Sequence, residues 1–273
     1  MTMEQIYARQ SLPLSSIANA RQLGGYTMPN GCRVRKGLLF RSGKLMNATP
    51  QDLDFLAHTL GVKTVIDLRT AFELEHMPDR MVPDASYVNM PVEDADNNMW
   101  LEMFQFPGET MHDQLLAFCR TERAKRMTEE TYIGYVADEF CQLQYAAFFQ
   151  KLLFIEGPVL WHCTQGKDRT GLASTFLLAI LGADRKTIVE DFALTNVPYQ
   201  PIVDALEVRL RASGGNDDDL RVIQAMEGVS VPYFEKALDY IDTIYGSMDN
   251  YLRNILVLTD KEKDILRHKY LES

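Results

Sequence analysis

The chain has 273 residues, of which 46% are hydrophobic and 24% are charged, and its formal net charge at pH 7 is −10. The composition is that of a globular protein, and no stretch approaches the roughly 20 apolar residues that cross a bilayer. So acidic a chain repels polyanions, which argues against nucleic acid as a partner, and an anionic substrate would need a local gathering of cations.

The N-terminal segment and the cysteines bear on the cellular compartment. The first 20 residues carry charged side chains and no apolar run, so we expect no signal peptide and a cytoplasmic location, with secretion left open. Cys32, Cys119, Cys141 and Cys163 form no C-x-x-C pair. This spacing argues against a zinc site and favours free thiols in a reducing compartment. The oligomeric state is not readable from the sequence.

In chain order, short apolar runs alternate with helical patterns. Strands are expected at 37–41, 63–68, 87–90 and 159–162. Between the first two, Thr49 can cap a helix that has Pro50 in its first turn and ends at Gly61. A helical pattern covers 128–154, and the C-terminal third is helical. Strands interleaved with helices indicate an α/β fold with a mostly parallel central sheet flanked by helices, followed by a helical C-terminal extension.

These patterns also suggest the domain organisation. We expect a single domain over 1–273, with a helical C-terminal part at 200–273. The segment 94–130 differs, because its polar start is followed by large apolar residues such as Trp100 and Phe104. Apolar side chains in an irregular segment suggest a lid over a site, and an ordinary insertion packed on the body is the equal alternative.

The segment that leads from the last predicted strand into the next helix carries the chemistry. It reads HCTQGKDRTG from His162 to Gly171, and an apolar helix follows to Leu181. A strand that ends in a short loop opening a helix lets successive backbone N–H groups point at one anion, and the helix dipole adds to them. Gly166 permits the tight turn, and Arg169 offers a planar fork that can grip two phosphate oxygens.

Cys163 lies at the bottom of this expected anion site. The field that attracts an anion also favours the thiolate, which is the nucleophilic form of a cysteine. The five residues between Cys163 and Arg169 let the loop circle a tetrahedral oxyanion. The Thr170 hydroxyl is placed to donate a hydrogen bond to the sulfur. The pattern therefore predicts a cysteine nucleophile that attacks phosphorus.

His162 to Gly171 resembles the H-C-x5-R-[S/T]-G signature of the protein tyrosine and dual-specificity phosphatases. The fuller form, H-C-x-x-G-K-D-R-T-G, is similar to that of a bacterial group that acts on both phosphotyrosine and phosphoinositides. Further segments agree with this group. They are NARQLGGY at 19–26, LFRSG at 39–43, VIDLR at 65–69 and EDFALTN at 190–196.

The resemblance implies the cysteine phosphatase fold and the hydrolysis of phosphomonoesters through a phosphocysteine, with no metal or other cofactor. Cys163 would be the nucleophile and Arg169 the phosphate-binding side chain. The implied substrate is a phosphorylated protein or a phosphoinositide. The loop residues implied to bind it are His162, Thr164, Gln165, Gly166, Lys167 and Thr170.

The resemblance leaves two candidates for the proton donor. Asp168 lies inside the signature, where the resembled group also has an aspartate with acid roles. Asp94 is the rival, because a second aspartate of that group falls at a similar place. We favour Asp168. Lys167 adds a cation beside the loop, which suits a substrate with more than one phosphate, and the alternative is an ordinary surface lysine.

Two other functions remain open at this level. A rhodanese-like sulfurtransferase also holds a cysteine in a strand-to-helix loop, but its loop is typically one residue shorter. An inactive phosphate-binding module would usually lack the cysteine or the arginine, and both are present.

The neighbouring charged residues have plainer interpretations. The side chains of Arg21, Arg41 and Arg69 either line the pocket or form ion pairs. The position of Asp67 beside Arg69 favours an ion pair there, because a buried arginine needs a partner. Glu73 is expected on the surface, either solvated or ion-paired.

Overall fold

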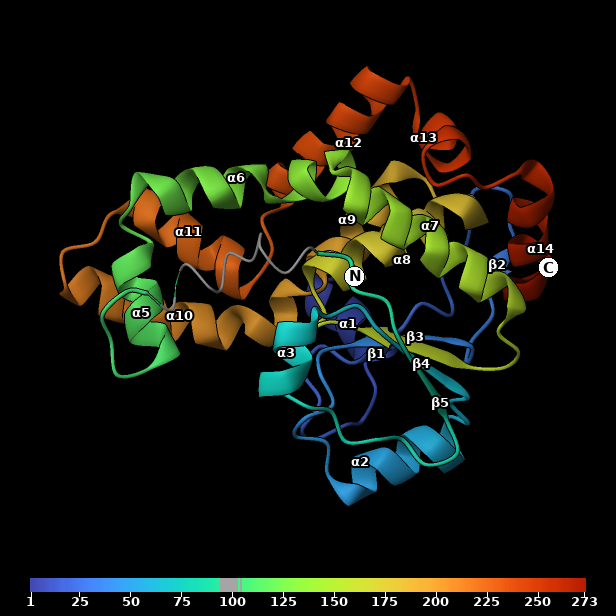
Figure 1. Ribbon diagram of the computed structural model, residues 1–273, viewed down its shortest axis with the longest axis horizontal. Helices are drawn as coiled ribbons and strands as arrows, with labels where there is room; N and C mark the ends of the chain where they lie inside the picture. The colour runs from blue at the N-terminus through green and yellow to red at the C-terminus, as the bar shows by residue number, and fades with distance from the viewer. Residues whose placement is uncertain (94–102, 104) are drawn as a thin grey trace.

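The computed structural model describes residues 1–93, 103 and 105–273 (Figure 1). Asp94 and the first part of the expected 94–130 insertion lie outside these residues, so the lid remains a prediction. Among the described residues, no helix combines the length and the apolar composition needed to cross a membrane.

Five strands form the central sheet, namely β1 (Arg21–Gln22), β3 (Leu39–Ser42), β4 (Thr64–Asp67), β5 (Ser86–Asn89) and β6 (Val159–His162). Their order is β1-β3-β6-β4-β5, with all neighbours parallel except the edge strand β1. The register places Ser42, Asp67 and Asn89 beside or near His162 at the ends of their strands. Sites in α/β sheets form at this carboxyl edge.

Both faces of the sheet are buried, as the continuous apolar runs of its strands require. Along β6, Val159 and Trp161 enter one core and Leu160 enters the opposite core, because successive side chains of a strand point to opposite faces. The larger core includes residues of α7 (Glu139–Phe154), α8 (Asp168–Leu181) and α12 (Val231–Tyr245). The smaller core lies against α2 (Pro50–Asp54) and the short π-helix η1 (Phe55–Thr59).

A third apolar cluster joins four helices at one end of the molecule (Figure 1). They are α5 (Met111–Phe118), α6 (Glu122–Ala137), α10 (Asn196–Ala212) and α11 (Asp217–Glu227). The other helices within the described residues are α1 (Met3–Gln10), α3 (Ala71–His76), α9 (Arg185–Ala193), α13 (Met248–Asn254) and α14 (Asp260–Tyr270). The short strands β2 (Arg33–Val34) and β7 (Leu271–Glu272) pair antiparallel, so the end of the chain contacts its N-terminal third.

The predicted α/β fold, with its mostly parallel sheet and its C-terminal helices, is confirmed. Element bounds shift slightly: the strand expected at 37–41 spans Leu39–Ser42. The helical pattern at 128–154 is divided in two. α6 ends at Ala137, and the Asp138 side chain caps α7 by accepting a hydrogen bond from the Cys141 N–H. A side-chain cap of this kind starts a new helix where the apolar pattern alone runs on.

A buried carboxylate ties α9 to the sheet. Asp191 lies 2.8 Å from Nη1 of Arg41 in β3 and 3.5 Å from Nε of Arg21 in β1. Tyr26 donates its hydroxyl to the same carboxylate. Two buried guanidinium groups therefore share one counterion, and the ion pairs expected as one alternative for these arginines are formed.

We expect Asp191→Asn to lower the free energy of unfolding by about 3–5 kcal/mol, because breaking a buried pair leaves its partners uncompensated. Urea unfolding followed by circular dichroism would measure the loss. Asp239→Asn is the matched control, since Asp239 pairs with Arg185 at 2.6 Å but both side chains are exposed. Its loss should stay below about 1 kcal/mol. Equal losses in the two variants would contradict the role given to Asp191.

Candidate active site

The loop between β6 and α8 is held from outside by its carbonyl oxygens. Three successive carbonyl groups accept hydrogen bonds from residues far away in the sequence. The donors are the Lys44 N–H to Thr164 O (3.1 Å), the Tyr199 hydroxyl to Gln165 O (2.8 Å), and Asn19 Nδ2 and Arg41 Nη2 to Gly166 O (2.8 and 2.9 Å). In a trans peptide the N–H points opposite to the carbonyl, so the following N–H groups face the inside of the loop.

These inward N–H groups, at residues 165 to 167, donate to no other residue that the structure describes. α8 begins directly afterwards, at Asp168, so the N–H groups of its first turn and its dipole lie beside the loop. The arrangement is a concave set of donors of the kind that binds anions.

Gly166 allows the loop to pass directly against β3. Its φ is +67°, and a Cβ at this position would lie 2.3 Å from the carbonyl carbon and oxygen of Ser42. A side chain would therefore meet both backbone strain and a backbone clash. The tight turn predicted for Gly166 is present.

Cys163 lies at the base of the loop and is 2% exposed. Three cations lie within electrostatic range of its sulfur, namely Arg41, Lys44 and Arg169. The Thr170 hydroxyl is buried but has no hydrogen-bond partner among the described residues, so the predicted hydrogen bond to the sulfur is not formed here.

Arg169 is fixed by Glu73 of α3, which is buried and not on the surface as expected. Nη1 and Nη2 of Arg169 donate to the two carboxylate oxygens at 2.6 and 2.8 Å. Burial opposes ionisation of this carboxyl, but the charge of Arg169 lowers the pKa of Glu73 to about 2, so it is ionised at neutral pH. Glu73 also accepts the Thr164 hydroxyl. The pair uses two of the five guanidinium N–H donors and leaves the Nε edge for a ligand.

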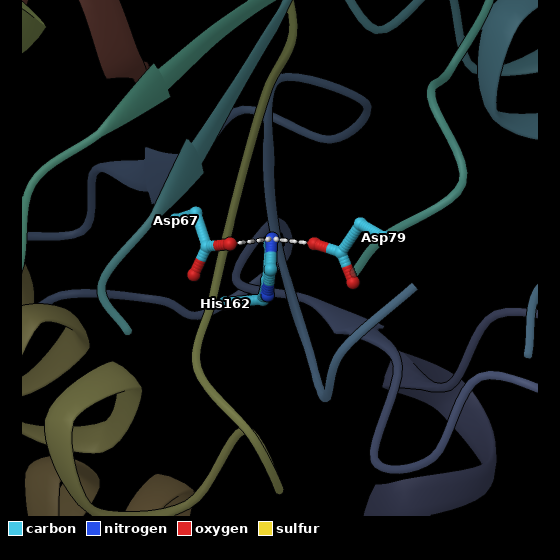
Figure 2. A group of neighbouring side chains, drawn as sticks. All are labelled: Asp67, Asp79 and His162. Atoms are coloured by element: carbon cyan, nitrogen blue, oxygen red, sulfur yellow. Dashed lines mark ion pairs between the residues drawn. The ribbon is translucent and has the colours of Figure 1, made fainter. Parts of the chain in front are cut away.

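His162 sits between two carboxylates behind the loop (Figure 2). Its Nε2 lies 3.1 Å from Asp79 Oδ2 and 3.8 Å from Asp67 Oδ2, and its Nδ1 lies 3.2 Å from the Cys163 carbonyl oxygen. Burial alone would lower the pKa of His162, but the two carboxylates raise it above its usual value. The two carboxylates lie on the Nε2 side of the ring and favour its protonated form, and the ring lies next to the cysteine.

The same three side chains have the composition of a metal site, and their ligand atoms lie within 4.8 Å of one another. The cation already present is Arg69, whose Nη2 lies 2.7 Å from Asp67 and 2.8 Å from Asp79. Because Arg69 is an ion-pair partner of both carboxylates, we interpret the cluster as structural, in line with the ion pair expected for Arg69.

Lys167 does not face the inside of the loop. The residue is 4% exposed. Its ammonium donates hydrogen bonds to the carbonyl oxygens of Ala225 (2.9 Å), Met226 and Gly228 (3.0 Å). It thus binds the last turn of α11, where cations are favoured. This position differs from the substrate-facing cation expected from the sequence.

Two carboxyl groups lie near Arg169 besides Glu73. Asp168, 20% exposed in its side chain, accepts the Tyr132 hydroxyl at 2.8 Å and lies 3.5 Å from the Lys167 ammonium. Glu93 lies 3.6 Å from Arg169 Nη1. Asp94, the other predicted acid, lies outside the described residues.

Four residues beside the loop were given no site role from the sequence. They are Lys44, Glu73, Asp79 and Glu93. Glu73 stands three residues after Thr70, and the two form a capping box, a pattern that explains a glutamate locally without pointing to the loop. Lys44 directly follows the LFRSG segment, which is the one available signal for it.

Comparison with known proteins gives a consistent result. A model of the tyrosine phosphatase family matches residues 12–272. A protein of Cupriavidus necator that carries the name of a tyrosine-protein phosphatase is 30% identical over 253 residues, covering 92% of this chain and 86% of that protein. The triple specificity protein phosphatase PtpB of Mycobacterium tuberculosis is 28% identical over 246 residues, covering 81% and 86%.

Among solved structures, the core catalytic domain of the PP-IP phosphatase SIW14 of S. cerevisiae matches 89% of this chain and 97% of that chain. The identity is 12% and the TM-score is 0.34. A likeness of this size supports no argument about fold or function.

The close approach of Gly166 to β3 can be tested against a second glycine. We expect Gly166→Ala to abolish the binding of inorganic sulfate, measured by calorimetry, because the added Cβ displaces the loop. Gly182→Ala is the control: its φ is also positive, at +93°, but a Cβ would meet nothing within 4 Å. It should cost about 1 kcal/mol of stability and leave sulfate binding intact. Similar sulfate affinities in both variants would show that the loop is not the anion site.

Proposed function

Because the chain belongs to the tyrosine phosphatase family and is a phosphatase, we propose that Cys163 is its nucleophile and that phosphotyrosine in proteins is its substrate. The observation that carries the proposal is a buried cysteine at the base of a loop whose N–H groups face inward. The family supports phosphatase chemistry over the sulfurtransferase alternative.

The proposed reaction has two steps. In the first, Sγ of Cys163 attacks phosphorus, the bond to the leaving oxygen breaks, and that oxygen keeps the electron pair and takes a proton from an acid. In the second, water attacks the phosphocysteine, the sulfur departs as thiolate, and the same group, now a base, takes the proton of the water. The products are the free hydroxyl compound and inorganic phosphate.

The loop supplies the stabilisation that this reaction needs. Negative charge spreads over the equatorial phosphate oxygens, and the inward N–H groups with the Nε edge of Arg169 would bind them. Because the donors are fixed before the substrate arrives, little reorganisation accompanies the reaction. Loss of one such donor typically costs about 3 kcal/mol of the activation barrier. Asp168 and Asp94 remain the acids predicted from the sequence.

We expect Cys163→Ser to lower phosphate release from p-nitrophenyl phosphate by on the order of 10³-fold or more, because a hydroxyl is a far weaker nucleophile at neutral pH. Sulfate affinity, measured by calorimetry, should change little, since the loop donors and Arg169 stay in place. Sulfate binding without any turnover in the unsubstituted chain would instead support the inactive module. Turnover of thiosulfate in place of phosphate esters would support the sulfurtransferase.

Lys44 is the observation that favours phosphoinositides as a second substrate class. Its charge lies within electrostatic range of Cys163 and of Glu73, whereas the ammonium of Lys167 is bound to α11. A cation beside the primary phosphate site can bind a second phosphate of an inositol headgroup.

Lys44→Met should therefore lower the hydrolysis of a doubly phosphorylated inositol lipid more than that of a phosphotyrosine peptide. The ratio of the lipid activity to the peptide activity should fall by about tenfold. Lys167→Met serves as the comparison and should lower both activities alike, because it acts through α11 and the shape of the loop. Steady-state kinetics on the two substrates would measure both ratios. Lipid-selective loss in the Lys167 variant alone would restore the role that the sequence predicted for it.

A further inference from the structure

Glu93 occupies a defined place at the carboxyl edge of the sheet. It follows β5, and the preceding Val92 is buried and donates its N–H to the Leu68 carbonyl at 3.2 Å. This bond extends the sheet and fixes the backbone beside the loop. The Glu93 side chain lies 3.6 Å from Arg169 Nη1 and is 13% exposed, so it can still be reached from outside.

The cations around Glu93 are already paired with other carboxylates. Arg169 is engaged by Glu73 through two hydrogen bonds. Asp168 is paired with Lys167, so that cation is also balanced. An ionised Glu93 would therefore add an uncompensated negative charge beside Arg169.

The titratable groups that face Glu93 come from four helices. They are Glu73 of α3, Tyr135 of α6, Cys141 of α7, and Asp168 and Arg169 of α8. Burial raises the pKa of Glu93 to about 7, and the charges of Glu73 and Asp168 add to this shift, whereas Arg169 and a hydrogen bond from Tyr135 oppose it. Glu93 is thus partly protonated at neutral pH, and a phosphate dianion bound at Arg169 would favour its protonated form further.

Asp168 lies beside different groups: its carboxylate accepts the Tyr132 hydroxyl at 2.8 Å and lies 3.5 Å from the Lys167 ammonium. A proton donor must carry its proton when the leaving oxygen departs.

We propose that Glu93, in preference to Asp168, donates the proton to the leaving oxygen. The inference rests on the proposed function of Cys163. As the phosphorus–oxygen bond breaks, the leaving oxygen takes the carboxyl proton of Glu93. The resulting carboxylate then takes a proton from the water that attacks the phosphocysteine, which restores the starting state.

Two substrates that differ in their leaving group test the proposal. Glu93→Gln should lower kcat on phenyl phosphate, a poor leaving group, by about 10²-fold, and on p-nitrophenyl phosphate by only a few fold. Asp168→Asn should lower both to a similar extent. Glu75→Gln, on the exposed side of α3, is the control and should change neither.

The pH profile gives a second readout. Because the protonated carboxyl is the active form, kcat/KM of the unsubstituted chain should fall as the pH rises through about 7. Glu93→Gln should remove this alkaline limb, whereas Asp168→Asn should keep it. A leaving-group effect in the Asp168 variant, or an alkaline limb that survives in the Glu93 variant, would overturn the proposal.

A binding measurement separates this proposal from the proposed function. The measurement uses the Cys163→Ser variant. Sulfate keeps its charge between pH 6 and 8, so a change in its affinity reflects a change in the protonation of the protein. We expect sulfate to bind about tenfold more weakly at pH 8 than at pH 6, because ionised Glu93 repels it. With Glu93→Gln added, the affinity should vary less than about twofold. Equal pH dependence in both proteins would exclude Glu93, even where Cys163 proves to be the nucleophile.

Discussion

The loop from Cys163 to Arg169 keeps its shape because other parts of the chain bind its outward carbonyl oxygens. The donors come from the segment before β1, from β3 and the residue that follows its turn, and from α10. Each neutral bond contributes about 1 kcal/mol, and the bond from the Arg41 guanidinium contributes more. Their common effect is directional: with the carbonyls fixed outward, the N–H groups face inward without a ligand. Preorganisation of this kind is what an oxyanion site needs, since donors that must first rotate lose part of their effect.

An acidic chain with net charge −10 can still hold an anion, because three arginines near the loop have fixed positions. Arg41 is held by Asp191, Arg69 by Asp67 and Asp79, and Arg169 by Glu73. Charges separated by more than about 8 Å are largely screened at physiological ionic strength, so the nearby cations outweigh the distant surface carboxylates. The buried ion pairs add little net stability, because desolvation offsets their attraction. What they provide is a fixed orientation of the arginine side chains beside the loop.

The sequence predicted the sheet, the loop and α8 because each depends on residues close together in the chain. Short apolar runs, a glycine at the turn and an apolar helix after the loop are local signals. The contacts that decide the chemistry are not local: Glu73 lies 96 residues from Arg169, and the carbonyl of Ala225 lies 58 residues from Lys167. Lys167 was expected to face the substrate because it is next to the loop, and only the packing of α11 turns it away. In the segment after β5, the sequence pointed to Asp94. The burial that raises the pKa of Glu93 depends on helices packed around it, which the sequence does not show.

The helices beyond residue 195 are part of the active-site scaffold. Lys167 joins the loop to the last turn of α11, and the Asn196 side chain fixes the following backbone through two hydrogen bonds with Val229. Tyr199 of α10 holds the Gln165 carbonyl. A displacement of α10 or α11 would therefore change the direction of the loop N–H groups, although neither helix supplies a reacting group. The family match, which runs to residue 272, includes both of these helices. Through these contacts, α10 and α11 hold the loop in its observed geometry.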